Sequence, residues 1–313
     1  MAIRGRDGAP GRGGEEAHEP RPDRSGPQQP RRHGNHLTIT RGGVRCVTRA
    51  PHPHFLLNDG CAPGTSPTGA QPLGCNRTRP SADVPAGKRA ALEALGARVV
   101  PYHRHRDRRE AMVHRIALRD GQVIVPSAND HAVIAGAGTV AWEMLQEVHD
   151  LAAILVPVGG GGLTAGAALA ASGQDVKVIG VEPAAADDTR RSLRAGYRVP
   201  IPPPSTIADG LGHTEPAMLP FEINRRLLAD VVTVSEQAIA DAMAYLWRHY
   251  RSAAEPSGAV AFAGLLQAAD RLPDGPVGVV LAGGNVDWPT YRRLLDDAME
   301  PTERSIHVAP VLR

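Results

Sequence analysis

Four consecutive glycines, Gly159–Gly162, are the residues whose type and spacing point most directly to chemistry. The apolar run Ala152–Val158 before them predicts a buried strand, and the residues from Leu163 onward predict a helix. A turn without Cβ atoms lets several backbone N–H groups converge at the positive end of a helix dipole, which favours phosphate binding. A flexible loop is the alternative for an isolated glycine run. The run matches neither GxGxxG nor GxxxxGKS/T, which argues against a dinucleotide-binding fold and a P-loop.

Length and charge limit what the whole chain can be. A chain of 313 residues forms one large or two medium domains, and a net charge of +2 does not indicate a nucleic-acid partner for the chain as a whole. Only Lys88 and Lys177 are lysines, so arginine carries nearly all the positive charge. No apolar stretch reaches the roughly 18 residues of a membrane span, and the N-terminus lacks the apolar segment of a secretory signal.

The cysteines indicate a reducing compartment. Cys46, Cys61 and Cys75 are an odd set, and their spacing is not that of metal ligands. Free thiols in a cytoplasmic protein are therefore the expectation.

Residues 1–80 differ in composition from the rest of the chain. They are dense in Arg, Gly and Pro and keep neither helical nor strand periodicity for long. Such a composition cannot bury enough apolar surface to offset chain entropy, which predicts disorder. An arginine-rich arm that binds nucleic acid is a less favoured alternative, because few aromatic residues lie among the arginines. A coding stretch read out of frame would have the same composition.

From Ser81 onward, predicted strands and helices alternate. This order predicts an α/β fold with a parallel sheet and helices on both faces. The predicted helices are 85–97, 107–117, 132–148, 163–172, 236–250, 257–269 and 289–299, and the predicted strands are 98–102, 122–125, 152–158, 176–182, 230–234 and 277–281. Trp142, Leu145 and Val148 are expected on one side of the helix over 132–148. Ligands of such sheets bind beyond the carboxyl ends of the strands, where Gly159–Gly162 and Gly283–Gly284 lie.

Short motifs spread over residues 81–313 resemble the fold-type II pyridoxal-phosphate enzymes, specifically the serine/threonine dehydratase and serine racemase group. The resemblance implies the fold of these tryptophan synthase β-like enzymes, with an incomplete small domain. It divides the chain into residues 1–80, a remnant of the small domain over 81–130, and a large cofactor-binding domain over 131–313. The motifs are Val133–Thr139, Pro157–Leu163, Gly180–Pro183, Asp187–Asp188, Thr206–Gly210, Glu255–Gly258 and Gly283–Asp287.

The resemblance implies a role for several of these motifs. Gly159, Gly160, Gly161, Gly162 and Leu163 would donate backbone N–H groups to the phosphate of pyridoxal 5'-phosphate. Glu255 matches a glutamate near the pyridine ring, although a charged residue that opens a helix is the plainer interpretation. Thr206–Gly210 would form part of the active-site wall. Ala282 stands where the family usually has a hydroxyl or thiol that bonds the ring nitrogen.

The resemblance also implies a divalent-cation site. Glu182 and Asp188 would supply carboxylates and Ala186 a backbone carbonyl, a set of hard oxygen ligands that suits magnesium, calcium or manganese. The alternative is a solvated acidic turn at the start of a helix, where the helix dipole favours negative charge.

The family's catalytic lysine has no convincing counterpart here. The family places its Schiff-base lysine in a Ser-Phe-Lys motif and binds the substrate carboxylate at a Ser-Gly-Asn-His loop, and neither motif is intact in this chain. Lys88 matches an ordinary surface lysine, and Lys177 begins a strand far from the glycines. Gly34-Asn35-His36 matches part of the carboxylate loop, but its surroundings differ, so chance explains it better.

The resemblance implies a threonine or serine dehydratase, an ammonia-lyase that converts a hydroxy amino acid to a 2-oxo acid and ammonia, or a serine racemase. The missing lysine leaves a second hypothesis open, a non-catalytic remnant that binds pyridoxal phosphate or phosphate. A third hypothesis is the arginine-rich arm on a degenerate enzyme domain. The expected partner is a small hydroxy amino acid, without membrane association, and dimers are usual for the family.

Overall fold

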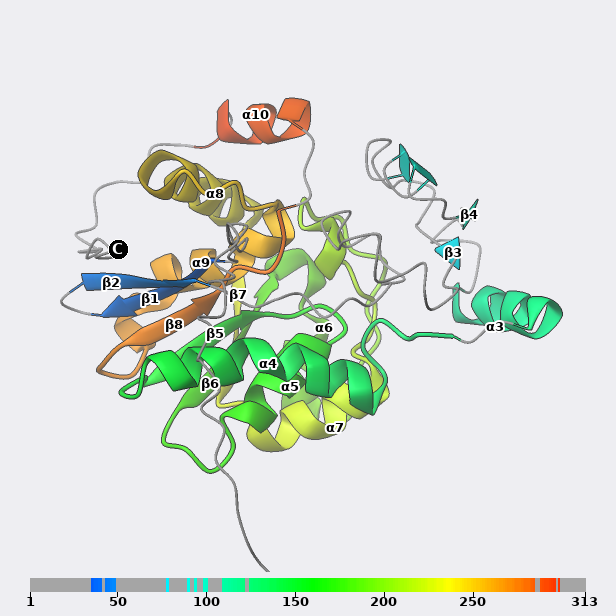
Figure 1. The fold of residues 1–313 in the computed structure, drawn as a ribbon, viewed down its shortest axis with the longest axis horizontal. Helices are drawn as coiled ribbons and strands as arrows, with labels where there is room; N and C mark the ends of the chain where they lie inside the picture. Colours follow the sequence, from blue (N-terminus) through cyan, green and yellow to red (C-terminus); the bar gives the residue numbers. More distant parts are fainter. Residues whose placement is uncertain are drawn as a thin grey trace, which may run out of the picture. The chain divides into compact units, whose positions relative to one another are not determined.

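The computed structural model describes residues 35–40, 43–48, 77–78, 89–90, 93–94, 98–100, 109–121, 124–284, 288–296 and 298. Its main feature is a six-stranded sheet with the strand order β2-β1-β8-β5-β6-β7 (Figure 1). These strands are β1 (Asn35–Thr40), β2 (Gly43–Thr48), β5 (Ala153–Pro157), β6 (Lys177–Pro183), β7 (Asp230–Val234) and β8 (Val277–Val280). The neighbours β8, β5, β6 and β7 are parallel, which confirms the predicted parallel sheet.

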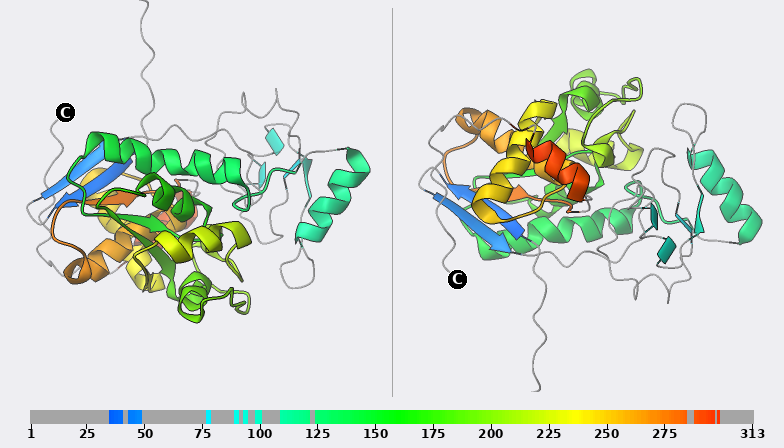
Figure 2. Two further views of the ribbon diagram at one scale, coloured as in Figure 1. Left: turned by 90° about the horizontal axis from the view of Figure 1, so that it is seen from below. Right: turned by 90° about the horizontal axis from the view of Figure 1, so that it is seen from above.

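Helices cover both faces of the sheet. They are α4 (His131–Glu147), α5 (Gly162–Ala170), α6 (Asp188–Ala195), α7 (Met218–Leu227), α8 (Glu236–Tyr250), α9 (Pro256–Ala268) and α10 (Trp288–Asp296). Figure 2 shows α4 and α5 along one face and α8 and α9 over the other. Every residue of β5 and β8 is buried. Neither strand has a polar side chain, as expected for parallel strands that are covered on both faces.

The two faces of the sheet belong to two apolar cores. Along β5, Leu155 packs into the core under α8 and α9, whereas Ile154 and Val156 pack into the core under α4 and α5. This division follows from the strand repeat, in which successive side chains point to opposite faces. The paired cores fix the end of β5, and therefore the position of the glycine loop, residues Gly159–Gly162, that follows it.

The composition of residues 1–80 predicts disorder, but the structure places three strands among the described residues of this segment, β1, β2 and Arg77–Thr78. β1 and β2 form an antiparallel hairpin, and β1 also pairs with β8, with Ile39 opposite Val277 and His36 opposite Val280. The physical reason is a short alternation of apolar and polar residues around Leu37 and Ile39, enough to complete the edge of an existing sheet. The arginine-rich stretches 4–14 and 27–32 lie outside the described residues, and so do Cys61 and Cys75.

Between this hairpin and α4, the described residues include two short strands and a helix. β3 (Arg77–Thr78) and β4 (Arg98–Val99) make a two-stranded parallel sheet, and α3 spans Arg109–Asp120. The described residues 124–126 are not part of a strand, and residues 122 and 123 of the strand predicted over 122–125 lie outside the described residues. Among the described residues, no helix is long and apolar enough to cross a membrane.

Candidate functional site

The glycine loop joins the carboxyl end of β5 to the start of α5. Gly161 is the N-cap of α5 and has a φ of 87°, a left-handed conformation that a residue with a Cβ rarely adopts. No side chain in the described part of the chain caps this helix. The predicted strand–glycine–helix arrangement is therefore confirmed, and α5 presents the open N-terminus expected of a phosphate site.

Neighbouring segments hold the loop from both sides. A Cβ on Gly159 would lie 3.0 Å from His213 Cδ2, and a Cβ on Gly162 would lie 3.1 Å from the Cα of Ala128. A Cβ on Gly161 would lie 2.9 Å from Asn224 Nδ2. Close approach, as well as backbone conformation, therefore requires glycine here.

The N–H groups of the loop are available to a ligand. No described residue accepts a hydrogen bond from the backbone N–H of Gly159 through Leu163. The carbonyls of Gly160 and Gly161, in contrast, accept hydrogen bonds from Ala217 N and Ala165 N, respectively. A group of unpaired N–H donors at a helix start suits a phosphate group, and the residues present therefore fit the phosphate of pyridoxal phosphate.

Three further predicted motifs lie around this loop. The carbonyl of Gly210 would lie 3.2 Å from a Cβ on Gly159, and the N–H of Gly210 donates to Ser257 Oγ at 3.0 Å. Ser257 follows Glu255, whose N–H donates to the carbonyl of Gly283 at 3.2 Å. The segments Pro157–Leu163, Thr206–Gly210 and Glu255–Gly258 and the described part of Gly283–Asp287 are thus brought together at one edge of the sheet. Asn285, Val286 and Asp287 lie outside the described residues.

The segment Thr206–Gly210 is held by the start of α8. Glu236 Oε2 accepts hydrogen bonds from Thr206 Oγ1 at 3.1 Å and from Ile207 N at 2.7 Å. Ala208 is fully buried in the core under α8 and α9. These contacts make the segment a fixed wall beside the glycine loop.

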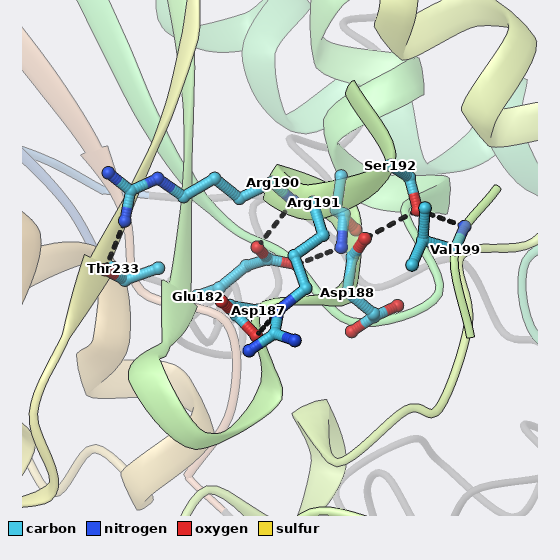
Figure 3. A network of polar contacts seen from close by, with 9 residues as sticks. Glu182, Asp187, Asp188, Arg190, Arg191, Ser192, Val199 and Thr233 are labelled. Atoms are coloured by element: carbon cyan, nitrogen blue, oxygen red, sulfur yellow. Dashed lines mark hydrogen bonds and ion pairs between the residues drawn. The ribbon is translucent and has the colours of Figure 1, made fainter. Parts of the chain in front are cut away.

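Two buried carboxylates lie near the start of α6 (Figure 3). Glu182, at the end of β6, accepts hydrogen bonds from the backbone N–H groups of Thr189 and Arg190, both at 3.0 Å. Asp188 is 1 % exposed, and its Oδ2 has no hydrogen-bond partner among the described residues. Asp187, between them in the chain, instead pairs with Arg191 at 2.8 Å.

Burial governs the electrostatics of this acidic pair. Desolvation raises the pKa of Glu182 to about 7, although the hydrogen bonds from Arg190 and Thr189 lower it. Desolvation and then the charge of Glu182 raise the pKa of Asp188 to about 8. Ala186, which would add a carbonyl, is fully buried beside them. Among the described residues, no group of three or more His, Cys, Asp or Glu side chains is placed so that it could hold a metal ion.

The two lysines differ in what the structure describes. Lys177 is exposed and pairs with Ala153 at the start of β5, whereas Val181 pairs with Pro157 next to the glycine loop. Since a strand rises about 3.3 Å per residue, Lys177 lies roughly 13 Å from Val181 along β6, at the opposite end of the parallel strands. Lys88 lies outside the described residues.

The remaining predicted residues have the following positions. Ala282 packs against the core under α4 and α5. Asn35 and His36 begin β1, beside the end of β8, and Gly34 lies outside the described residues.

Sequence reasoning missed two side chains that contact the glycine loop, those of His213 and Asn224. His213 lies three residues after the Thr206–Gly210 motif, and its position there was the only available signal. Asn224 lies on α7, a helix that the sequence did not predict. Its Nδ2 donates to the carbonyl of Gly161 at 3.2 Å.

A parallel sheet with a glycine loop, an open helix start and the Glu255–Gly283 turn at one edge defines a phosphate-cofactor protein of the α/β class. The family model "Pyridoxal-phosphate dependent enzyme" matches residues 79–283, and the chain belongs to this family. Its fold is that of the fold-type II enzymes, as the resemblance implied.

Curated and solved relatives agree with this assignment. The chain is 40 % identical over 215 residues to the L-threo-3-hydroxyaspartate ammonia-lyase of Saccharomyces cerevisiae, covering 68 % of this chain and 66 % of the relative. It is 37 % identical over 215 residues to the serine racemase of Schizosaccharomyces pombe, covering 68 % and 67 %. The chain thus spans about two thirds of the length of these relatives.

Among solved structures, a threonine deaminase from T.th. is similar with a TM-score of 0.67 and 35 % identity, covering 76 % of this chain and 80 % of that one. Maize serine racemase is similar with a TM-score of 0.66 and 31 % identity, covering 72 % and 71 %. The relatives are therefore the ammonia-lyases and racemases that the motifs of the chain resemble.

Proposed function

We propose that this chain binds pyridoxal 5'-phosphate and acts on a small hydroxy amino acid, as an ammonia-lyase or a racemase. The observation that carries the proposal is the set of backbone N–H groups from Gly159 to Leu163 that have no acceptor among the described residues. In this proposal the glycine loop and Leu163 bind the phosphate, and Glu255 lies near the ring. The wall Thr206–Gly210 limits access of water to the same place. The bound cofactor would supply the electron sink for loss of the α-proton.

The substrate class follows from the relatives. Threonine, serine and 3-hydroxyaspartate all carry a hydroxyl on Cβ. Loss of that hydroxyl together with the α-proton, as water, leaves an enamine, which water hydrolyses to a 2-oxo acid and ammonia. A racemase would instead return the proton to the opposite face of Cα. Both reactions start from the same bound amino acid, so the class of substrate is common to them and measurement of the products distinguishes them.

A second candidate function is cofactor binding without turnover. Family chemistry requires a lysine at the cofactor, and Lys177 lies at the opposite end of the parallel strands from the glycine loop. Lys88 is the other lysine of the chain. Ala282 has no hydroxyl that could bond the ring nitrogen, which would make the bound cofactor a weaker electron sink.

One experiment separates the two candidates. The purified chain is titrated with pyridoxal phosphate by equilibrium dialysis and then incubated with L-serine, L-threonine and L-threo-3-hydroxyaspartate. Binding together with release of 2-oxo acid, or with formation of D-serine, supports the first candidate. Binding without either product supports the second. Absence of binding rejects both, and a Gly161→Asp variant, which places a carboxylate in the loop, is the negative control.

We also propose that Glu182, the carbonyl of Ala186 and Asp188 bind a divalent cation, Mg²⁺, Ca²⁺ or Mn²⁺. Support comes from the unpartnered buried Oδ2 of Asp188 and from the neighbouring buried charge of Glu182. A cation between two buried carboxylates would offset their mutual repulsion. We further propose that the protein is cytoplasmic and forms a homodimer. Light scattering coupled to gel filtration would test the dimer.

A further inference from the structure

The carbonyl of Gly161 accepts more hydrogen bonds from described residues than any other carbonyl of the glycine loop. It accepts hydrogen bonds from Ala165 N at 2.9 Å, Thr164 Oγ1 at 2.9 Å and Asn224 Nδ2 at 3.2 Å. Asn224 Nδ2 also donates to Thr164 Oγ1 at 3.2 Å. Thr164 is fully buried and Asn224 is 1 % exposed, so solvent does not compete for these bonds.

The neighbouring carbonyl is held from the same side. Ala217 N, at the start of α7, donates to the carbonyl of Gly160 at 3.2 Å. In a planar trans peptide the C=O and the following N–H point in opposite directions. Since α7 and α5 hold the carbonyls of Gly160 and Gly161, the N–H groups of Gly161 and Gly162 are directed away from them. These N–H groups are among those available to a phosphate.

A loop of four glycines cannot fix this orientation by itself. Glycine has the widest choice of φ and ψ, and no side chain packs to hold the peptide plane. The orientation must therefore come from donors outside the loop, which are Thr164, Asn224 and two backbone N–H groups.

Packing alone does not explain an asparagine at residue 224. Asparagine is a poor helix former, and the Oδ1 of Asn224 is buried without a partner among the described residues. Leaving that oxygen unpaired is costly. A leucine would fill a similar volume without this cost, so the amide is explained by the bonds that Nδ2 donates.

We propose that Thr164 and Asn224 are positioning residues that orient the Gly161–Gly162 peptide toward the cofactor phosphate. Neither side chain need touch the cofactor. The part that concerns phosphate rests on the proposed function, whereas the part that concerns peptide orientation does not.

The test uses the full chain and a matched set of substitutions. Thr164→Val removes the hydroxyl at constant shape, and Thr164→Ser restores it. Asn224→Leu removes the amide. Thr139→Val is the control, because Thr139 Oγ1 makes the same type of bond to a carbonyl three residues earlier, that of Gly136, at 2.8 Å on α4 and away from the loop.

The first readout is the affinity for pyridoxal phosphate, measured by equilibrium dialysis. The unfolding midpoint of each variant without cofactor is measured for comparison. Thr164→Val and Asn224→Leu should each weaken binding about tenfold, the effect of one lost buried hydrogen bond. Thr164→Ser and Thr139→Val should bind like the parent chain. Weakening that merely follows the unfolding midpoint, or parent-like binding by Thr164→Val, would overturn the proposal.

The second readout needs no cofactor. In a sample labelled with ¹⁵N-glycine, Thr164→Val and Asn224→Leu should shift or broaden the amide signals of Gly161 and Gly162, whereas Thr164→Ser and Thr139→Val should not. Unchanged signals would overturn the proposal even if the chain binds no pyridoxal phosphate. Changed signals in a chain that binds none would support the orientation and reject the proposed function alone.

Discussion

The carboxylate of Glu255 lies directly against Gly283, so close that a Cβ on residue 283 would overlap Glu255 Oε1. Gly283 has a φ of 127°, which side-chain-bearing residues rarely adopt. Its carbonyl accepts the N–H of Glu255 and would lie 2.5 Å from a Cβ on Gly258. The turn after β8 and the start of α9 are therefore built as one unit, which fixes the position of Glu255 at the start of α9.

Gly283→Ala should lower the free energy of unfolding by at least about 3 kcal/mol, because backbone strain adds to the overlap with Glu255. Urea unfolding measures this loss. The control is Gly173→Ala, where φ is 84° but no atom of the described residues, apart from residue 173 and its chain neighbours, lies within 4 Å of the added Cβ. That variant should lose only about 1 kcal/mol from strain. Equal losses in the two variants would mean that the contact with Glu255 is not tight.

Asp188→Asn should abolish a stabilising effect of divalent cations. In the chelator-treated parent chain, Ca²⁺ or Mg²⁺ at 100 times its dissociation constant should add about 2.7 kcal/mol of stability, seen as a higher unfolding midpoint. Asp187→Asn is the matched control, since Asp187 is the adjacent acid but pairs with Arg191. If Asp187→Asn responds to the cation as weakly as Asp188→Asn, the effect is unspecific charge screening and the proposed site is wrong.

His213 and residue 159 should show energetic coupling. Gly159→Ala places a Cβ 3.0 Å from His213 Cδ2 and 3.2 Å from the carbonyl of Gly210. His213→Ala removes the first contact but not the second. The double variant should therefore be more stable than the sum of the single effects by about 1 kcal/mol, as measured by urea unfolding. Additive effects would show that the His213 ring moves aside freely.

The sequence predicted the elements whose signals are local. The helix expected over 236–250 is α8 at those bounds, because Ser235 caps it by accepting from Ala238 N and its apolar residues follow the helical repeat. The prediction that Trp142, Leu145 and Val148 lie on one side of the helix now labelled α4 agrees only in part with their burial. Leu145 and Val148 are buried, but Trp142 is 56 % exposed, since the buried stripe runs through Ala141 and Met144 instead.

The elements that were missed depend on distant partners. α6 is short and polar, and its first N–H groups are satisfied by Glu182 from the end of β6. α7 has no side-chain cap and contains Pro220, and it is held by contacts with α5 and the glycine loop. The same dependence explains the site. Family motifs predicted roles for the glycine loop and Glu255, whereas Asn224 reaches the loop only through the packing of α7.

Neither of the two lysines should be essential for binding of the cofactor phosphate. Lys177 lies about 13 Å along β6 from Val181, which pairs with Pro157 before the loop, so Lys177→Ala should bind pyridoxal phosphate with the affinity of the parent chain. Lys88→Ala should do so as well if the cofactor is held only through its phosphate. Borohydride treatment of the loaded chain followed by peptide mapping should then find no lysine peptide that carries the cofactor. A label on Lys88, with tight binding lost in Lys88→Ala, would instead identify that residue as the family's missing lysine and favour turnover over binding alone.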